Sequence, residues 1–143
     1  MGKKEIDDRF KKFGTVSFTA TSKVNDFMDY LEEGKVMASS CGKCGRTFFP
    51  PRADCPGCFS DSLGWVEVDR KGTLETFSEM KFGPVGFEDD LPYTIAVVNF
   101  KDFKMFGRLA DDMDPGGASI GMELVVRPNR LKNGQLNYVF RQP

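Results

Sequence analysis

The sequence predicts a mainly β protein, with helices at its N-terminal end, a metal-binding module and a small barrel. Four cysteines form two Cys-x2-Cys pairs, and six short β-prone runs separated by turn residues follow them. Apolar residues at helical spacing mark two segments near the N-terminus. We therefore divide the chain into an N-terminal arm, an amphipathic helix, a cysteine-rich module and a barrel, at residues 1–20, 21–34, 35–64 and 65–143.

The N-terminal arm carries one apolar stripe among many charges. Ile6, Phe10 and Phe13 are spaced as on one face of a helix, and Gly14 follows them. Because glycine readily adopts the left-handed conformation that ends a helix, this pattern predicts a short amphipathic helix. Residues 15–20 are β-prone, and we expect them to continue in an extended conformation.

The segment 21–34 predicts a second amphipathic helix. Thr21 or Ser22 is expected to cap its N-terminus, and Gly34 is expected to end it. Its apolar face either packs in the core of the chain itself or binds as an anchor in a groove of a partner, and the sequence leaves both roles open. The residues on this face are Val24, Phe27, Met28 and Leu31.

The cysteine-rich module predicts a structural zinc site. Its two Cys-x2-Cys pairs are ten residues apart, so two tight turns present four sulfurs to one ion. Four thiolates complete a tetrahedron and leave no position for water or substrate. The predicted metal ligands are Cys41, Cys44, Cys55 and Cys58. Iron in the same rubredoxin-like geometry, and disulfides or a lost metal, are the alternatives.

The C-terminal part of the chain predicts a barrel of five to six strands. The β-prone runs lie at 65–68, 72–80, 93–100, 103–109, 123–127 and 137–141. The phenylalanines in and between these runs are expected to fill the barrel core, although one or two of them would also suit stacking on an adenine or phenyl group. They are Phe77, Phe82, Phe87, Phe100, Phe103 and Phe106.

Composition restricts the function. The chain has no histidine, so it lacks the side chain that most often acts as a general acid or base near neutral pH, and independent catalysis is disfavoured. The net charge is −1, which gives no overall attraction to nucleic acid or to an anionic membrane. No apolar run is long enough to span a membrane, and the N-terminus has no signal-peptide pattern. We therefore expect a cytoplasmic protein that has no membrane partner.

Motifs along the chain resemble the acyl-CoA-associated zinc-ribbon/OB-fold family. In the first half they are FMDYLEEGKV at 27–36, CGKCGR at 41–46, FPPR at 49–52 and CPGC at 55–58. In the second half they are Trp65, GT at 72–73, PY at 92–93, FGRL at 106–109 and IGMEL at 120–124. The arm lies outside this pattern, and KDFK at 101–104 stands where the family commonly has glycine or small residues. The resemblance implies a rubredoxin-like zinc ribbon followed by an OB-fold.

The same resemblance implies a non-catalytic subunit that assists a thiolase-like enzyme acting on acyl-CoA. The partner would supply the reactive groups, and this chain would supply packing, shaping of the substrate channel and contacts to coenzyme A. The interface candidates are the four residues on the apolar helix face, given above, together with Phe48, Phe49, Pro50 and Pro51. The candidates for contacts to the phosphates of coenzyme A are Arg46, Arg52, Arg127, Arg130 and Lys132.

A module that binds single-stranded nucleic acid is the alternative, because zinc ribbons and OB-folds both serve that function. The charge distribution argues against it. Residues 65–123 hold six basic and twelve acidic side chains, where a positive groove would be expected. We therefore expect no nucleic-acid partner.

Overall fold

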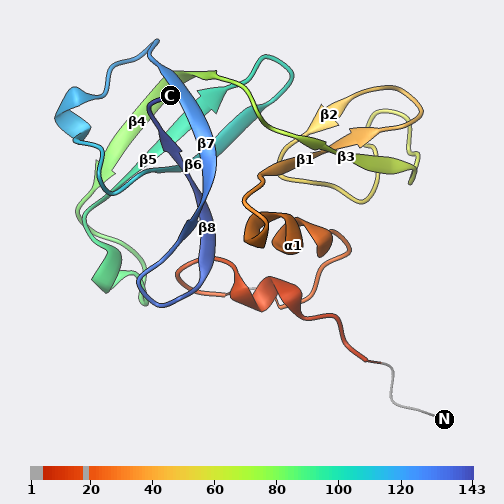
Figure 1. Ribbon diagram of the computed structural model, residues 1–143, viewed down its shortest axis with the longest axis horizontal. Helices are drawn as coiled ribbons and strands as arrows, with labels where there is room; N and C mark the ends of the chain where they lie inside the picture. The colour runs from red at the N-terminus through yellow and green to blue at the C-terminus, as the bar shows by residue number, and fades with distance from the viewer. Residues whose placement is uncertain (1–4, 18–19) are drawn as a thin grey trace.

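The computed structural model of the chain describes residues 5–17 and 20–143. A barrel and a smaller ribbon lie beside each other, and helix α1 and the N-terminal arm lie below them (Figure 1). The elements, in chain order, are η1 (Arg9–Lys12), α1 (Asp26–Glu32), β1 (Met37–Cys41), β2 (Thr47–Phe48), β3 (Leu63–Glu67), β4 (Gly72–Met80), η2 (Glu88–Asp90), β5 (Tyr93–Asn99), β6 (Lys104–Leu109), η3 (Pro115–Gly117), β7 (Glu123–Arg130) and β8 (Leu136–Arg141).

The barrel consists of the last five strands, in the order β4-β5-β6-β8-β7, and it closes where β7 pairs with β4. Neighbours are antiparallel except β6 and β8, which run parallel. Burial alternates along β5: Thr94, Ala96 and Val98 are buried, and the residues between them are half-exposed. This pattern is expected because successive residues of a barrel strand face alternately inward and outward. The predicted mainly β fold with a barrel of five to six strands is confirmed, and the barrel has five.

The ribbon is a three-stranded sheet in the order β2-β1-β3. Strand β1 pairs antiparallel with both neighbours, and Ser39 lies opposite Phe48 on one side and Trp65 on the other. Trp65 therefore belongs to the ribbon, although the sequence analysis placed the run 65–68 at the start of the barrel. The sheet to which a strand belongs is determined by the strand that it pairs with, and a β-prone run in the sequence does not identify that strand.

Helix α1 is shorter than predicted, and its cap differs. It begins at Asp26, and the preceding residue, Asn25, forms no side-chain cap. The prediction that Thr21 or Ser22 caps the helix is therefore wrong. Ser22 Oγ does accept a hydrogen bond from the Val24 N–H at 3.2 Å, but this bond lies before the helix begins. Phe27, Met28 and Leu31 are buried in the core of this chain, with exposed fractions of 3%, 0% and 2%. Their role as partner contacts is therefore corrected to an intramolecular one.

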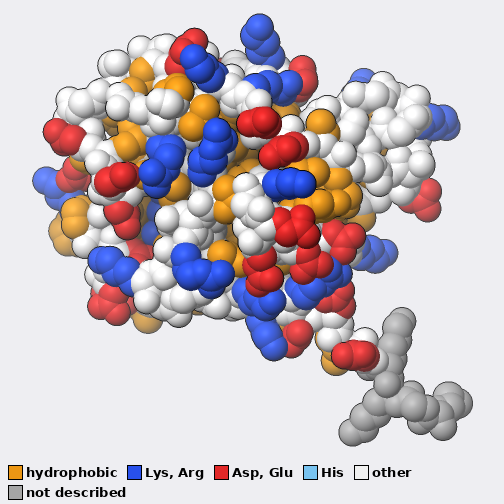
Figure 2. Space-filling view, viewed as in Figure 1, with side chains coloured by type: hydrophobic (Ala, Val, Ile, Leu, Met, Phe, Trp, Pro, Cys, Tyr) orange, Lys and Arg blue, Asp and Glu red, His pale blue; other side chains and the backbone are white. Residues whose placement is uncertain are grey.

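The N-terminal arm is folded against α1 and β8. Its helix is one 3-10 turn, and Ile6 lies outside it with 72% of its surface exposed, so only part of the predicted amphipathic helix is present. Phe10 stacks on Phe27 with ring centroids 6.1 Å apart, and the Arg9 guanidinium lies 2.9 Å from a carboxylate oxygen of Asp26. Figure 2 shows acidic and basic side chains close together in this region. The extended conformation predicted for 15–20 includes residues outside the described part of the chain.

The expectation that six phenylalanines fill the barrel core is wrong for three of them. Phe100 is buried and Phe77 and Phe103 pack against the core, but Phe82 and Phe106 are 85% and 60% exposed, and Phe87 is half-exposed in the loop before η2, outside the core cluster. Phe106 is in β6 and points outward from the barrel, while Phe82 lies in the loop after β4. In a closed barrel alternate residues of a strand face outward, whatever their hydrophobicity.

Phe49 joins the ribbon to the barrel. Its ring centroid lies 6.1 Å from that of Phe27, 6.1 Å from that of Phe103 and 5.2 Å from that of Tyr138. These neighbours come from α1, the β5–β6 turn and β8. One aromatic side chain therefore contributes to a single core that continues from the helix into the barrel.

Candidate functional site

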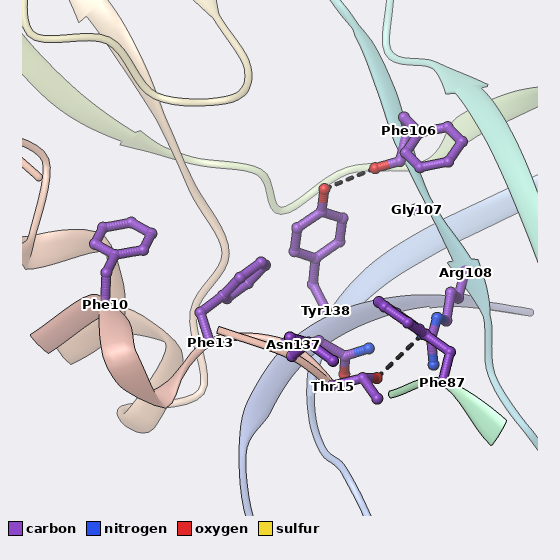
Figure 3. A pocket seen from close by; sticks show the side chains of 11 residues that line it. Phe10, Phe13, Thr15, Phe87, Phe106, Gly107, Arg108, Asn137 and Tyr138 are labelled. Atoms are coloured by element: carbon purple, nitrogen blue, oxygen red, sulfur yellow. Dashed lines mark hydrogen bonds between the residues drawn. The ribbon is translucent and has the colours of Figure 1, made fainter. Parts of the chain in front are cut away.

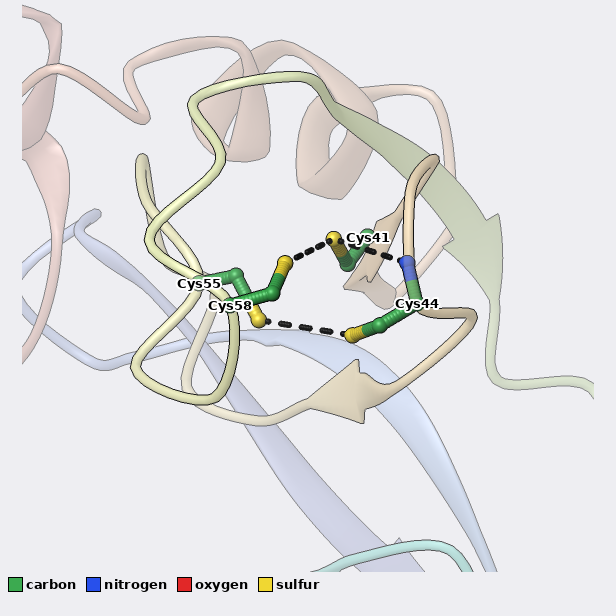
Figure 4. A group of neighbouring side chains, drawn as sticks. All are labelled: Cys41, Cys44, Cys55 and Cys58. Atoms are coloured by element: carbon green, nitrogen blue, oxygen red, sulfur yellow. Dashed lines mark hydrogen bonds between the residues drawn. The ribbon is translucent and has the colours of Figure 1, made fainter.

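The four cysteines converge at one end of the ribbon. Cys41 ends β1, Cys44 follows in the turn before β2, and Cys55 and Cys58 lie in the long loop before β3 (Figure 4). The Sγ atoms of Cys41 and Cys58 are 3.6 Å apart, and those of Cys44 and Cys55 are 3.5 Å apart. All four sulfurs lie within 4.8 Å of one another.

This spacing suits one tetrahedral metal ion. A zinc ion with Zn–S distances of about 2.3 Å requires sulfurs about 3.8 Å apart. The Cys44 N–H points at Cys41 Sγ from 3.5 Å, and this contact and the Lys43 N–H lower the pKa of the Cys41 thiol to about 6 although burial opposes the shift. Both features favour thiolate, which is the form that binds zinc. The residues fit a structural zinc site, with all four positions taken by protein.

The backbone around the sulfurs has the turns that such a site needs. Gly45 takes a φ of +77°, and its N–H donates to the Cys41 carbonyl at 2.9 Å. The second pair is closed in the same way, by the Phe59 N–H that donates to the Cys55 carbonyl at 2.8 Å. A Cβ at Gly57 would lie 2.2 Å from Arg46 Nη1, so a larger residue there would displace the Arg46 guanidinium. The two turns are therefore held by the chain itself.

The candidates for phosphate contacts do not meet in one place. Arg46 lines a hollow of about 500 Å³ between the ribbon and the β5–β6 turn, together with Lys104. Arg52 Nε donates to the Asp54 carbonyl at 3.3 Å, and Arg130 Nη1 donates to the Gly134 carbonyl at 2.7 Å. Arg127 lies in β7, is exposed, and donates through Nη1 to the Val126 carbonyl at 2.8 Å. Lys132, which is also exposed, follows β7 and lines a separate hollow of about 380 Å³.

The remaining interface candidates lie mostly at one junction. Val24, Phe49, Pro50 and Pro51 line an apolar hollow of about 250 Å³ between the arm, α1 and the ribbon. Phe48 is half-buried in β2 and lines the hollow beside Arg46 instead. Val24, Phe48 and Pro51 are half-exposed and Pro50 is exposed, so these four have the accessible surface that the buried residues of α1 lack.

A polar network between the arm and the barrel was not predicted from the sequence. Arg108 Nη1 lies 2.9 Å from an Asp90 carboxylate oxygen, Arg108 Nη2 donates to Thr15 Oγ1 at 3.1 Å, and the Thr15 hydroxyl donates to Asp90. The guanidinium also lies 4.1 Å from the ring centroid of Tyr93. The side chains of Arg108 and Asp90 are 16% and 11% exposed. The partners of Arg108 are distant along the chain, so the sequence does not reveal the network. An arginine within a β-prone run was the one feature that could have indicated it.

Among the described residues, no helix is both long and apolar enough to cross a lipid bilayer.

Comparisons with known proteins match both halves of the chain. The family model for the ChsH2 rubredoxin-like zinc ribbon domain matches residues 28–64, and the model for the ChsH2 C-terminal OB-fold domain matches residues 65–127. The structure is similar to that of an Ltp2-ChsH2(DUF35) aldolase, with a TM-score of 0.66 and 24% identity over 80% of this chain and 89% of the other.

Two relatives show the same similarity over most of their length. A DUF35 domain-containing scaffold protein of Methanothermobacter thermautotrophicus is 28% identical over 126 residues, which are 85% of this chain and 95% of the relative. The benzoylsuccinyl-CoA thiolase subunit BbsA of Thauera aromatica is 29% identical over 108 residues, which are 71% of this chain and 72% of BbsA. Together with the cysteine geometry and the closed barrel, these matches show that the chain belongs to the ChsH2 family of zinc-ribbon/OB-fold proteins.

Proposed function

We propose that this chain is a non-catalytic accessory subunit of a thiolase-type acyl-CoA enzyme complex. The observation that carries the proposal is the similarity to relatives named as a scaffold protein and as a thiolase subunit, each matched over most of its own length. Benzoylsuccinyl-CoA thiolase, an enzyme of anaerobic toluene degradation, is the specific complex that we propose on the strength of the BbsA similarity.

The chemistry of the chain supports an accessory role. A zinc ion held by four sulfurs has no open position at which it could activate water or polarise a carbonyl. The sequence contains no histidine for proton transfer. In the proposed complex the reactive groups belong to the partner, and this chain contributes to assembly and to binding of the acyl-CoA.

The accessible interface candidates give the proposal a specific surface. Val24, Pro50 and Pro51 lie around one apolar hollow, and Phe48 lies on the same ribbon. An apolar side chain that is accessible in the isolated chain stabilises a complex when a partner covers it, and it contributes less to the stability of the chain alone.

Among the phosphate candidates, Arg46 is the one that we propose for contact with coenzyme A, because it lines an open hollow together with Lys104. Asp102 lines the same hollow, and Lys104 forms an ion pair with Glu75 at 2.9 Å, so Arg46 supplies the main positive charge there.

The test is purification of the full chain, loaded with zinc, together with its partner from the cells that express it. We expect a thiolase-type subunit in fixed stoichiometry and thiolysis of acyl-CoA that needs both chains. Val24→Asp should weaken the complex, whereas Val66→Asp, at a 41% exposed position of β3 away from the hollow, should leave it intact. Recovery of single-stranded nucleic acid, or of a thiolase fully active by itself, would contradict the proposal.

A further inference from the structure

A pocket of about 360 Å³ lies between the N-terminal arm and the barrel (Figure 3). One wall is formed by arm residues between Phe10 and Val16, and the other by residues of β6, β8 and the loop before η2. The matched family models begin at residue 28, so the arm wall lies outside them. The pocket does not include the cysteines or the phosphate candidates, and the proposed function does not use it.

Most of the pocket surface is aromatic. Phe13 and Tyr138 have ring centroids 6.2 Å apart, and Phe87 and Phe106 line the opposite side. Phe106 keeps 60% of its surface exposed although it sits in a strand, so its ring is available to a ligand. The Tyr138 hydroxyl donates to the Phe106 carbonyl at 2.6 Å, and this bond connects β8 to β6 beside the pocket. A flat ring of similar size would have stacking partners here.

The other end of the pocket has hydrogen-bond donors. Arg108 has five N–H groups, and the described residues provide acceptors for two of them, Asp90 and Thr15. The Oδ1 atom of Asn137 accepts from Asn129 Nδ2 at 3.0 Å, and the side-chain amide N–H groups of Asn137 have no acceptor within 5–17 and 20–143. The pocket therefore presents donors that lack acceptors, and a ligand oxygen would satisfy them.

The charge at this end favours a neutral ligand. Asp90 lies 2.9 Å from Arg108 and offsets its positive charge. The guanidinium also stacks on Tyr93, which fixes its plane, so the remaining N–H groups keep a defined direction. A carboxylate would place a second negative charge beside Asp90, whereas a carbonyl oxygen would accept the same bonds without that repulsion.

We propose that this pocket binds a small neutral aryl carbonyl compound, such as an aryl ketone. The ring lies between Phe13, Phe106 and Tyr138, and the carbonyl oxygen accepts hydrogen bonds from Arg108 and Asn137. The volume and the mainly apolar lining with a few polar groups at one end are typical of ligand pockets. Millimolar affinity is expected for a ligand of this size.

The test is a titration of the isotope-labelled, zinc-loaded full chain with acetophenone, followed by NMR. The amide signals of Gly14 and Gly107, which line the pocket, should shift, and those of Gly64 and Gly121 should not. Fluorobenzene has the ring without the carbonyl, and benzoate has the negative charge, so both should bind more weakly than acetophenone. The experiment uses the isolated chain, so its result does not depend on the proposed complex.

Two matched variants test the aromatic wall. Phe106→Ala removes an exposed ring that lines the pocket and should weaken acetophenone binding about two- to tenfold, the value of one aromatic pair. Phe82→Ala removes an even more exposed ring outside the pocket and should leave binding unchanged. Unshifted Gly14 and Gly107 signals, equal binding of fluorobenzene, or an unaffected Phe106→Ala variant would each overturn the proposal.

Discussion

The ribbon and the barrel are stabilised by different means, although they lie side by side in one small chain. The barrel has a continuous apolar interior in which Leu74, Val98, Met105, Leu124 and Phe140 are completely buried. The ribbon buries a few mostly small side chains at β1, from Val36 to Ser39, together with Cys41 and Cys55, and its loops are largely exposed. Hydrophobic burial therefore accounts for the barrel, whereas the ribbon has less apolar burial and we expect it to depend on a metal held by its four cysteines.

The two halves also share one contact region. Phe49 of the ribbon packs on Phe27 of α1 and on Tyr138 of β8, so α1 belongs to both. Orange side chains at the junction of the two halves are visible in Figure 2. A change confined to one half should consequently leave the other folded but alter its stability. The following experiments separate the two contributions.

Loss of the metal should have the largest effect. Structural zinc contributes on the order of 10 kcal/mol to folding of such modules, so Cys44→Ser should release the zinc and unfold residues of β1 to β3. The signals of β4 to β8 should remain dispersed in NMR spectra. Metal analysis should find one zinc per wild-type chain. Ser40→Ala, a neighbour in β1 that is not a ligand, serves as the control and should keep its zinc. Iron in the wild type, or a folded ribbon in Cys44→Ser, would contradict this prediction.

Removal of a barrel core side chain should have the next largest effect. Phe140→Ala leaves a cavity at a completely buried position and should lower the free energy of unfolding by about 3–5 kcal/mol. Zinc content should stay at one per chain, since the ligands are untouched. Phe106→Ala makes the same chemical change at a 60% exposed position and should cost less than about 1 kcal/mol. Urea titration measures the free energy of unfolding of both variants. Similar losses in the two would show that burial of the phenylalanine does not determine its contribution to stability.

The ion pair between Arg108 and Asp90, beside the arm, should make stability depend on pH. Burial raises the pKa of the Asp90 carboxyl, but hydrogen bonds from Thr15 and the charge of Arg108 outweigh it, so the pKa lies below its ordinary value. A carboxyl with a lowered pKa in the folded state stabilises the protein above its ordinary pKa, and this contribution is lost as the pH falls through the lowered value.

Asp90→Asn should therefore cost about 1.5–3 kcal/mol near neutral pH, and the difference from wild type should shrink as the pH falls below about 4. Unfolding curves measured across this range test the prediction. Asp111→Asn, at an exposed position, should behave like wild type throughout. A constant difference at all pH values would show that the carboxylate charge of Asp90 is not the cause.

The smallest expected effect concerns the turn between β5 and β6. Lys101 takes a φ of +77°, in the left-handed region where a side chain is strained. Lys101→Gly should therefore raise the free energy of unfolding by about 1 kcal/mol. Asp102→Gly changes the next residue, which lacks a positive φ, and should not stabilise the protein. Equal effects of the two glycines in thermal unfolding would rule out backbone strain at Lys101.

Features with a local signal could be predicted from the sequence. The cysteine spacing predicted that the four sulfurs converge, because two tight turns and one return loop are enough to bring them together. The barrel strands were located for a similar reason, since runs of β-branched and aromatic residues between turn residues have few alternatives. The departure at 101–104 from the family pattern also marked a real feature, the strained Lys101.

Properties that depend on distant partners were determined only by the tertiary structure. The apolar face of α1 fits a core or a partner equally well, and only packing on Phe10 and Phe49 assigns it to the core. The assignment of Trp65 to the ribbon depends on its pairing with Ser39. The pocket between the arm and the barrel requires contact between Thr15 and Arg108, which are 93 positions apart in the chain.

The sequence by itself thus determined the cluster of four cysteines and the strands, because both follow from short-range spacing and local conformational preference. The tertiary structure decided which apolar residues are buried, which strand joins which sheet, and where Arg108 finds its partners. Those outcomes depend on contacts between residues far apart in the chain, and hydrophobicity at one position does not specify the neighbour that will cover it.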